Sequence, residues 1–534
     1  MGYLKSFGTT FIWVSTVLVA ITHIPGLPPH VEFTPYEFKP PAAIEHQSNG
    51  RLNGAEKLFD GEIKGPEYFD SYDGVLYTTL HLGTVSKLVG NKLVEVVKFG
   101  KKCDGMWEEE KCGRPLGLKF DKQGRLYVVD AYYGVFKVDV ETGKYEKIID
   151  ISVPIEGKVA MLPNSIDVAS NGDLFWTVSS NDFQLKDGMF SMLTDPTGRL
   201  IRYDAATKRN VVLLENLGFA NGIKLSDDES FVLVAESLKL RIVKYHLKGP
   251  KAGSSEILIE GLPGVPDNIH SDGQGNFLVS LYVLADEEHP LLSQSLAPHS
   301  NIRKLIVRAM TLLEAPFKLL DQVYPNYYSK QIVHSIGHFE SSAGLFHEGV
   351  VVLRIDPTGK VIDVLDETDG KLSRISSAFP LGDYLYLGSP FNQYLARVPL
   401  DTALPGLKKA FKSEPQVVKQ IPTPKIEEKP IPKPAEIRTT TEKPLPPPPP
   451  PPTTTTAPPP PATVSSPPQV QAPSPTTTPP PPPVQAPKII IEPVDIPVEV
   501  PVVPKPTKIP QVNVPVQKPQ AIPQQKKHVV KDEM

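Results

Sequence analysis

The sequence predicts an all-β body, a six-bladed β-propeller, with an N-terminal transmembrane helix before it and a disordered Pro/Thr-rich tail after it. Three observations lead to this prediction. A pattern of short strands and turns recurs through residues 50–400. An apolar stretch opens the chain, and 36 of the 60 prolines lie in residues 421–534. The expected organisation is a cytosolic stub and signal-anchor helix (1–31), a linker (32–49), the propeller (50–405) and the tail (406–534).

The stretch at residues 7–24 (FGTTFIWVSTVLVAITHI) contains no Asp, Glu, Lys or Arg. Its 18 residues are close to the minimum needed to span a bilayer core of about 30 Å. Because Lys5 precedes it, the positive-inside rule places the N-terminus in the cytosol and the rest of the chain outside or in a lumen, a single-pass type II topology. A cleaved signal peptide, which would make the protein secreted, and a buried helix are the alternatives. Cleavage after Ala20 would leave Leu18, not a small residue, at the −3 position.

The recurring pattern in the body is a Gly/Pro turn, an apolar strand, a polar turn, and a strand rich in Tyr, Val, Leu and Phe. The first five instances start 48, 49, 57 and 46 residues apart. Several short strands in each repeat of this length are typical of a β-propeller, whereas a β-sandwich would not repeat at such a period. Six instances predict six blades: 65–89, 113–139, 162–180, 219–247, 265–283 and 375–400.

An insertion at about residues 286–346 separates the fifth instance from the sixth. Its central segment, 301–324 (NIRKLIVRAMTLLEAPFKLLDQVY), carries apolar residues at helical spacing. We expect a helix that packs on the blades. A lid over the central site, or a basic amphipathic helix that touches the membrane, is the alternative.

The tail is filled with Pro, Thr, Val and Gln, a composition that cannot bury apolar surface and that favours polyproline II. In a secretory compartment its Thr/Ser clusters predict an O-glycosylated, mucin-like stalk that glycan-binding partners could recognise; an unmodified spacer is the alternative. The sequence contains no N-x-[ST] sequon. Its last residues, Lys-Asp-Glu-Met, differ by one residue from the lumenal retention signal K-D-E-L.

Charge and cysteine content exclude several classes of protein. Residues 401–534 hold 16 Lys/Arg and 11 Asp/Glu, a net charge of +5, whereas residues 1–400 hold 40 and 49, a net charge of −9. An acidic body argues against nucleic acid as a partner. The two cysteines, Cys103 and Cys112, exclude a disulfide-dense scaffold and a Cys-rich zinc site. Their spacing permits a small disulfide loop, with two free buried thiols as the alternative.

Oxygen-bearing side chains occur at the same point of four repeats. Glu67 follows Gly-Pro, Asn164 follows Leu-Pro, Asn221 follows Phe-Ala, and Asp267 follows Val-Pro with Asn268 beside it. Because a propeller brings the strand starts of all blades to one axis, these residues should converge. Ca²⁺ prefers such oxygen ligands, so the sequence predicts a calcium site. Each residue alone could simply form a turn, above all Asn221, which precedes a glycine.

Four motifs give the body a recognisable resemblance: KCGRPLGLKF (111–120), LPNSID (162–167), FANGIKLSDD (219–228) and VPDNI (265–269). The body resembles the six-bladed calcium-dependent phosphotriesterase-like propellers, which include paraoxonases, gluconolactonase-type lactonases and strictosidine synthase. Within them, the strictosidine synthase-like adipocyte plasma membrane-associated protein and hemomucin group is the most similar. The resemblance covers residues 1–400, and in hemomucin the mucin-like tail as well.

The resemblance implies roles for particular residues. It makes Glu67, Asn164, Asn221 and Asp267 ligands of a catalytic calcium, with Asn268 an accompanying ligand, and it pairs Cys103 with Cys112 in a disulfide. Three positions depart from the relatives. Leu116 and Ala131 stand where paraoxonases carry their two active-site histidines, and Ser376 stands where strictosidine synthase carries its general acid/base Glu. Strictosidine synthase activity is therefore not expected.

These features predict a weak, calcium-dependent hydrolase of the arylesterase or lactonase type, acting on small esters or lactones. The metal would polarise the substrate carbonyl, and Asp267 could serve as base or nucleophile as well as ligand. His81 and His270 are the other candidate bases, although structural roles would account for both. The alternative is a non-catalytic, mucin-like recognition or adhesion protein of the cell surface with a structural calcium. An intracellular scaffold for SH3 or WW partners would need a cytosolic tail.

Overall fold

The computed structural model describes residues 2–42, 48–345 and 349–407. The predictions made for the tail, namely disorder, O-glycosylation and the retention signal, concern residues 408–534, which lie outside the described residues.

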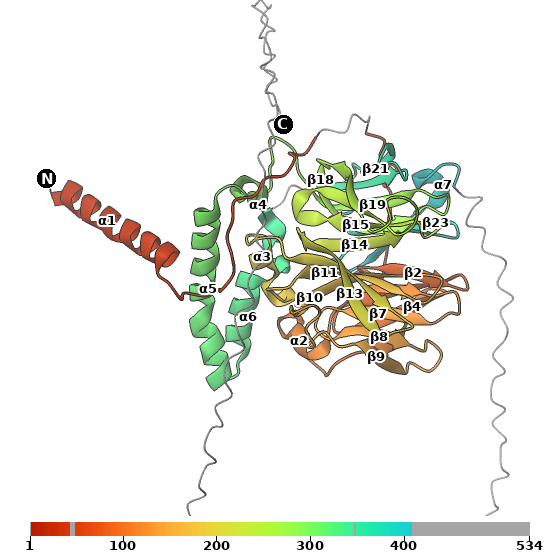
Figure 1. Cartoon of the computed structure of the whole chain (residues 1–534), viewed down its shortest axis with the longest axis horizontal. Coiled ribbons are helices and arrows are strands. Elements are labelled where there is room, and N and C mark those ends of the chain that lie inside the picture. The colour runs from red at the N-terminus through yellow and green to blue at the C-terminus, as the bar shows by residue number, and fades with distance from the viewer. Residues whose placement is uncertain (1, 43–47, 346–348, 408–534) are drawn as a thin grey trace, which may run out of the picture. The chain divides into compact units, whose positions relative to one another are not determined.

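Six antiparallel sheets of four strands each form a closed ring of blades, as predicted (Figure 1). The first three blades comprise β2 (Phe69–Tyr72), β3 (Val75–Leu80), β4 (Thr84–Val89) and β5 (Lys92–Lys98); β6 (Pro115–Phe120), β7 (Leu126–Asp130), β8 (Gly134–Val138) and β9 (Tyr145–Ile149); and β10 (Leu162–Val168), β11 (Leu174–Ser180), β12 (Gly198–Asp204) and β13 (Arg209–Leu217). The others comprise β14 (Ala220–Leu225), β15 (Phe231–Glu236), β16 (Arg241–His246) and β17 (Ser255–Glu260); β18 (Gly264–Ser271), β19 (Phe277–Leu284), β20 (Val350–Ile355) and β21 (Val361–Glu367); and β22 (Ser377–Leu381), β23 (Tyr384–Gly388) and β24 (Leu395–Pro399) with β1 (Glu56–Leu58).

The sixth blade closes the ring because its outermost strand comes from the other end of the body. Strand β1 pairs antiparallel with β24, with Lys57 opposite Ala396. The first strand of each blade is innermost, and each of these strands contacts the corresponding strands of both neighbouring blades. Closure of this kind protects the sheet edges that would otherwise remain unpaired.

The core lies between successive blades, since each sheet is covered on both faces. Tyr77 and Val97 of the first blade pack with Leu118 and Val128 of the second in one buried cluster. Strand β11 is buried along its whole length and includes Trp176, which is fully buried. This double coverage explains why the strands read as continuous apolar runs with little polar alternation.

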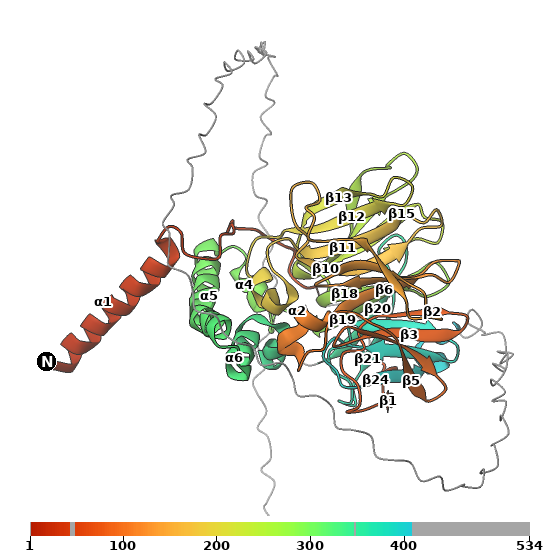
Figure 2. The same ribbon diagram turned by 90° about the horizontal axis from the view of Figure 1, so that it is seen from below.

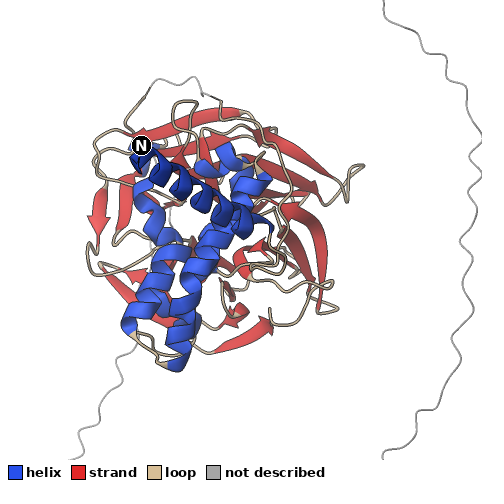
Figure 3. Ribbon diagram, turned by 90° about the vertical axis from the view of Figure 1, so that its left-hand side faces the viewer, coloured by secondary structure: helices blue, strands red, loops and turns tan. Residues whose placement is uncertain are grey.

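The insertion leaves the fifth blade between β19 and β20 and contains α4 (Leu292–Leu296), α5 (Ser300–Val323) and α6 (Tyr327–Gly337), followed by the 3₁₀ helix η4 (Phe339–Leu345). In Figure 3, where the helices face the viewer, they lie across one end of the ring of strands. The predicted helix at 301–324 exists and packs on the propeller as expected, through the buried Val307 and the ion pair between Arg303 and Asp195. Part of its apolar face, including Ile302, Leu312 and Leu313, is nevertheless exposed.

Short helices complete the elements: η1 (Met106–Glu108) with α2 (Glu109–Cys112), η2 (Leu185–Asp187) with α3 (Gly188–Ser191), η3 (Ser237–Lys239) and α7 (Leu400–Ala403). The N-terminal helix α1 spans Gly2–His23. Its window Ser6–His23, with a mean hydropathy of 1.3, is the only part of the described residues that is long and apolar enough to cross a membrane. The segment after α1 is held on the propeller, since Thr34 donates its backbone N–H to Asp195 at 2.8 Å and Ala42 donates to the Gly261 carbonyl at 2.8 Å.

Candidate metal centre

Four of the five predicted ligands, Glu67, Asn164, Asn221 and Asp267, line one cavity of about 700 Å³. They come from four different blades: Glu67 lies two residues before β2, and the other three lie within the first four residues of β10, β14 and β18. In β10, β14 and β18 the pairing register shifts at these positions, between Pro163 and Ile166, Ala220 and Ile223, and Pro266 and Ile269. Such bulges turn side chains out of the regular alternation, and they direct Asn164, Asn221 and Asp267 toward the cavity.

Gly222 allows two of these strands to approach closely. A Cβ at this position would meet the Asp267 carbonyl oxygen at 2.4 Å and the Asn268 Cα at 2.7 Å. The Asn221-Gly222 pair therefore lies inside a strand and serves close packing between blades, and it does not form the turn that was the alternative interpretation.

The defining feature of the cluster is a set of buried oxygens without hydrogen-bond partners: the Oδ1 atoms of Asn164, Asn221, Asp267 and Asn268. The Asn164 amide is oriented by its Nδ2, which donates to Ser179 Oγ at 3.1 Å, while that hydroxyl donates to the Ala220 carbonyl at 2.8 Å. Unsatisfied buried acceptors are costly and rare in folded proteins. Carboxylate and amide oxygens are the ligands that Ca²⁺ takes, so these residues fit a bound calcium ion.

The electrostatics of the two carboxyl groups point the same way. Burial raises the pKa of Asp267 well above its usual range, and the neighbouring Glu67 raises it further. Burial also raises the pKa of Glu67, although the Arg114 guanidinium, 3.5 Å away, opposes the shift. Among the described residues, Arg114 is the cation that pairs with these two carboxyl groups, and a divalent cation would compensate the remaining charge of the ionised pair.

The rest of the cavity wall is mostly apolar and comes from both the blades and the insertion. Leu116, one of the lining residues, replaces the first paraoxonase histidine. Ala131, at the second such position, is fully buried and packs in the same cluster as Leu116. Ser376 is buried as well, and its hydroxyl is 3.4 Å from the Gly388 carbonyl. None of these three can transfer protons as the histidines or the glutamate would.

His81 and His270 are not among the residues that line this cavity. The His81 ring is buried, with Nε2 2.5 Å from the Pro390 carbonyl. His270 lines a different cavity and hydrogen-bonds the Ser377 hydroxyl at 2.7 Å. Burial lowers the pKa of both rings to about 3, so both are neutral at pH 7. Their catalytic role remains a prediction that this placement does not favour.

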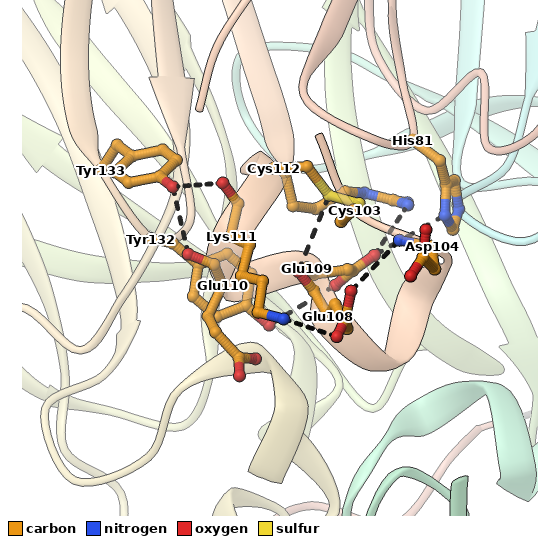
Figure 4. The surroundings of a disulfide bond; sticks show 11 residues. His81, Cys103, Asp104, Glu108, Glu109, Glu110, Lys111, Cys112, Tyr132 and Tyr133 are labelled. Carbon is orange, nitrogen blue, oxygen red and sulfur yellow. Dashed lines mark hydrogen bonds and ion pairs between the residues drawn. A yellow bond between two sulfur atoms is a disulfide. The ribbon is translucent and has the colours of Figure 1, made fainter. Parts of the chain in front are cut away.

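A buried ionic network that the sequence did not reveal adjoins the cluster through the contact between Arg114 and Glu67. Figure 4 shows two of its members, Glu109 and His81, near the disulfide. Glu109 is 3.4 Å from Arg114, 3.6 Å from His81 and 3.5 Å from His338 of the insertion. Arg114 also donates to the Pro390 carbonyl at 2.8 Å, which fixes the guanidinium beside Glu67. The CGR motif could have drawn attention to Arg114, but no sequence signal links Glu109 with His338, more than 200 residues away.

The disulfide between Cys103 and Cys112 is formed, as predicted, with Cα atoms 5.6 Å apart. It closes the loop that carries η1 and α2 and therefore restrains Glu109 (Figure 4). Tyr133 supports the same loop, because its hydroxyl donates to the Lys111 carbonyl at 2.7 Å.

Comparison with known proteins decides the family. Hemomucin, an adipocyte plasma membrane-associated protein of Drosophila melanogaster, is 40% identical over 407 residues, covering 74% of this chain and 70% of hemomucin. The rat adipocyte plasma membrane-associated protein is 31% identical over 362 residues, covering 67% of this chain and 89% of the relative. This chain belongs to the adipocyte plasma membrane-associated protein family. The expected group is thereby confirmed.

The chain also matches two protein-family models. Residues 164–250 match strictosidine synthase, and residues 45–88 match the N-terminal region of strictosidine synthase-like proteins. The first of these ranges includes Asn164 and Asn221, and the second includes Glu67. Among solved structures, a gluconolactonase from Xanthomonas campestris is similar with a TM-score of 0.41 and 14% identity, covering 70% of this chain and 99% of that protein.

Proposed function

We propose that this member of the adipocyte plasma membrane-associated protein family is a membrane-anchored, calcium-binding propeller that hydrolyses small esters or lactones. One observation carries the proposal: buried, unpartnered oxygens of Asn164, Asn221 and Asp267 meet Glu67 in the wall of an apolar cavity. The oxygens supply a cation site, and the cavity supplies room for the acyl or aryl part of a substrate.

In this proposal Glu67, Asn164, Asn221 and Asp267 hold the calcium ion, with Asn268 beside them. When bound, Ca²⁺ polarises a carbonyl and stabilises the developing oxyanion. The apolar wall, including Leu116 and Phe339, excludes water from the substrate. A carboxylate has two oxygens, so Asp267 can bind the cation through one and accept a proton from the attacking water at the other. Arg114 balances the charge of Glu67 and holds its carboxylate in place.

The Tyr282 hydroxyl adds a hydrogen-bond donor to the same cavity. Tyr282 lines the cavity, and burial raises the pKa of its phenol, so the group stays protonated at neutral pH. A protonated phenol can donate to a substrate oxygen, which would orient an ester in a site that offers few other donors.

Membrane anchoring through α1 completes the proposal. The relatives are named plasma membrane-associated proteins. The window Ser6–His23 of α1 has the length and composition of a membrane span. With Lys5 on the cytosolic side, the propeller and the tail would be extracellular or lumenal. The tail would then be placed for O-glycosylation and for glycan-binding partners.

A second candidate is a non-catalytic recognition head in which the calcium ion is structural. The placement of His81 and His270 outside the cavity favours it, as do Leu116 and Ala131 at the positions of the paraoxonase histidines. In that case the ion stabilises the fold by mass action, and the cavity serves as a binding site.

The deciding experiment uses the full chain in lipid nanodiscs. Hydrolysis of phenyl acetate and a panel of lactones is measured with calcium and with EGTA, for the native chain and for Asp267→Asn. Calcium-dependent turnover that the substitution abolishes supports the hydrolase. A calcium-induced rise in melting temperature without turnover supports the recognition head, and neither turnover nor stabilisation would reject both.

A further inference from the structure

Helix α5 presents an unbroken apolar face to the outside of the protein. Residues at steps of three or four along it share one side of the helix, as helical geometry requires. Leu313 is 58% exposed and Val323 is 78% exposed, and they belong to a row of apolar side chains, which is more informative than a single exposed residue. We call this the outer face of α5; it comprises Ile302, Leu305, Ala309, Leu312, Leu313, Pro316, Leu319, Leu320 and Val323.

Charged residues of α5 lie on the side that faces the propeller, beside the buried Val307. Arg303 is fully buried and pairs with Asp195 at 3.2 Å. Glu314, 1% exposed, pairs with Lys318 at 2.7 Å, and Lys318 in turn pairs with Asp187 at 3.2 Å. A helix on the surface of a soluble protein buries its apolar side and solvates its charges. Helix α5 buries Val307 but exposes most of its other apolar residues, and it buries Arg303 and Glu314 with ion-pair partners.

The apolar surface continues past the end of α5 into α6. Tyr324, Tyr327 and Tyr328 are exposed, and Ile332 follows one turn later on α6. Tyrosine is enriched where proteins meet the headgroup layer of a membrane, because its ring is apolar and its hydroxyl is polar. A contiguous exposed patch of this kind marks an interaction surface.

The same helix is joined to the candidate membrane span. Arg308 Nη1 donates to the carbonyl oxygens of Ile21, Thr22 and Ile24 at 3.0 Å each. These carbonyls are at the C-terminal end of α1, where a cation is favourable. Figures 1 and 2 both show α5 between α1 and the blades, so a bilayer that contains α1 would begin at α5.

We propose that the outer face of α5, continued by the tyrosines of the α5–α6 connection, lies in the interfacial layer of the same bilayer that α1 spans. The proposal rests on the membrane anchoring given above as part of the proposed function. Lipid is favoured over a second copy of the chain as the occupant, because the Arg308 junction already brings the bilayer to this helix. Since the insertion also supplies Leu291, Leu292 and Phe339 to the cavity wall, docking places that wall next to lipid.

The test compares single introduced cysteines carrying an environment-sensitive fluorophore, on the full chain in phosphatidylcholine nanodiscs. Val323→Cys reports the outer face, Val211→Cys is the matched control on an exposed strand of the third blade, and Val14→Cys reports α1. Doxyl-labelled lipid should quench the fluorophore at 323 and at 14 severalfold more than at 211. Unchanged melting temperatures confirm that the labelled chains are folded.

The other outcomes separate the possible failures. Quenching at 14 with none at 323 would overturn the docking proposal and leave the anchor intact. Absence of quenching at 14 would overturn the anchor itself, and the docking proposal with it. Shielding at 323 that requires no lipid and increases with protein concentration would assign the face to a second copy of the chain.

Discussion

The first strands of the blades, with the residues just before them, carry two polar clusters, which are three residues apart in the first, third and fourth blades. The cavity cluster contains Glu67, Asn164, Asn221 and Asp267. The second, which we call the closed cluster, contains Asp70, Asp167, Lys119 and Lys224. In the closed cluster Lys119 pairs with Asp70 at 2.9 Å and Lys224 pairs with Asp167 at 2.5 Å. Backbone N–H groups of Phe120 and Leu225 donate to the same two carboxylates at 2.7 and 2.9 Å.

The two clusters differ in how their buried carboxylates are compensated. Burial tends to raise the pKa of Asp167, but Lys224 and Lys119 hold it below its usual range. Burial raises the pKa of Asp267, and Glu67 raises it further. The closed cluster is neutralised by ion pairs within the protein, and its residues line two smaller cavities. In the cavity cluster Arg114 lies beside Glu67, while the Oδ1 atom of Asp267 has no hydrogen-bond partner, and the calcium ion of the proposed function would compensate this carboxylate.

The largest expected effect separates Asp267 from Asp167. Asp267→Asn removes a charged ligand and should weaken calcium binding by about 100-fold or more, since ligand charge sets calcium affinity. Asp167→Asn, the matched control, should leave calcium affinity within about twofold of the native value, because additivity holds for sites without shared partners. Isothermal titration with calcium measures both.

Asp167→Asn should instead lower the free energy of unfolding by about 3–5 kcal/mol, because it leaves the Lys224 ammonium without its buried partner. Denaturant unfolding in calcium measures this loss. Equal calcium affinities for the two variants would remove the distinction between the clusters, and the cavity cluster would then be another structural network.

A smaller effect should come from the group that orients Asn164. Ser179→Ala removes the acceptor of the Asn164 Nδ2 donor, so the amide can rotate away from the cavity. Loss of such a supporting contact typically costs about tenfold in metal affinity. Thr177→Ala is a fair control, because Thr177 lies on the same strand and its hydroxyl donates to the Asn221 carbonyl, not to a ligand side chain. Equal affinities in both variants would show that Asn164 is not a ligand.

The smallest expected effect is on the pH dependence of stability. Without calcium, Glu67 and Asp267 have pKa values above those of the unfolded chain, so the unfolded chain binds fewer protons and stability falls as pH rises above about 4. Bound calcium removes this penalty. The calcium-induced rise in melting temperature should therefore be larger at higher pH. Each kcal/mol of calcium stabilisation corresponds to a rise of about 2–4 °C. A rise independent of pH, or one retained by Glu67→Gln/Asp267→Asn, would contradict the assignment.

The sequence determined the propeller, since each repeat forms a small apolar sheet. The faces of such sheets are buried when similar sheets pack around a common axis. It determined the convergence of Glu67, Asn164, Asn221 and Asp267, because equivalent positions of repeats are equivalent in space. The Cys103–Cys112 disulfide also followed, through the family resemblance.

Only the tertiary structure decided what depends on contacts between distant segments. Glu109 and His338 meet across the insertion, and no periodicity encodes that contact. His81 and His270 were both candidate bases from the sequence, because an imidazole can accept a proton. Neither residue lines the cavity. The apolar stripe of α5 has the spacing of a core helix, yet it points outward, because Val307 and the ion pairs of Arg303 and Lys318 hold the other side of the helix on the propeller. Spacing fixes which residues share a face, but the surrounding structure fixes where that face points.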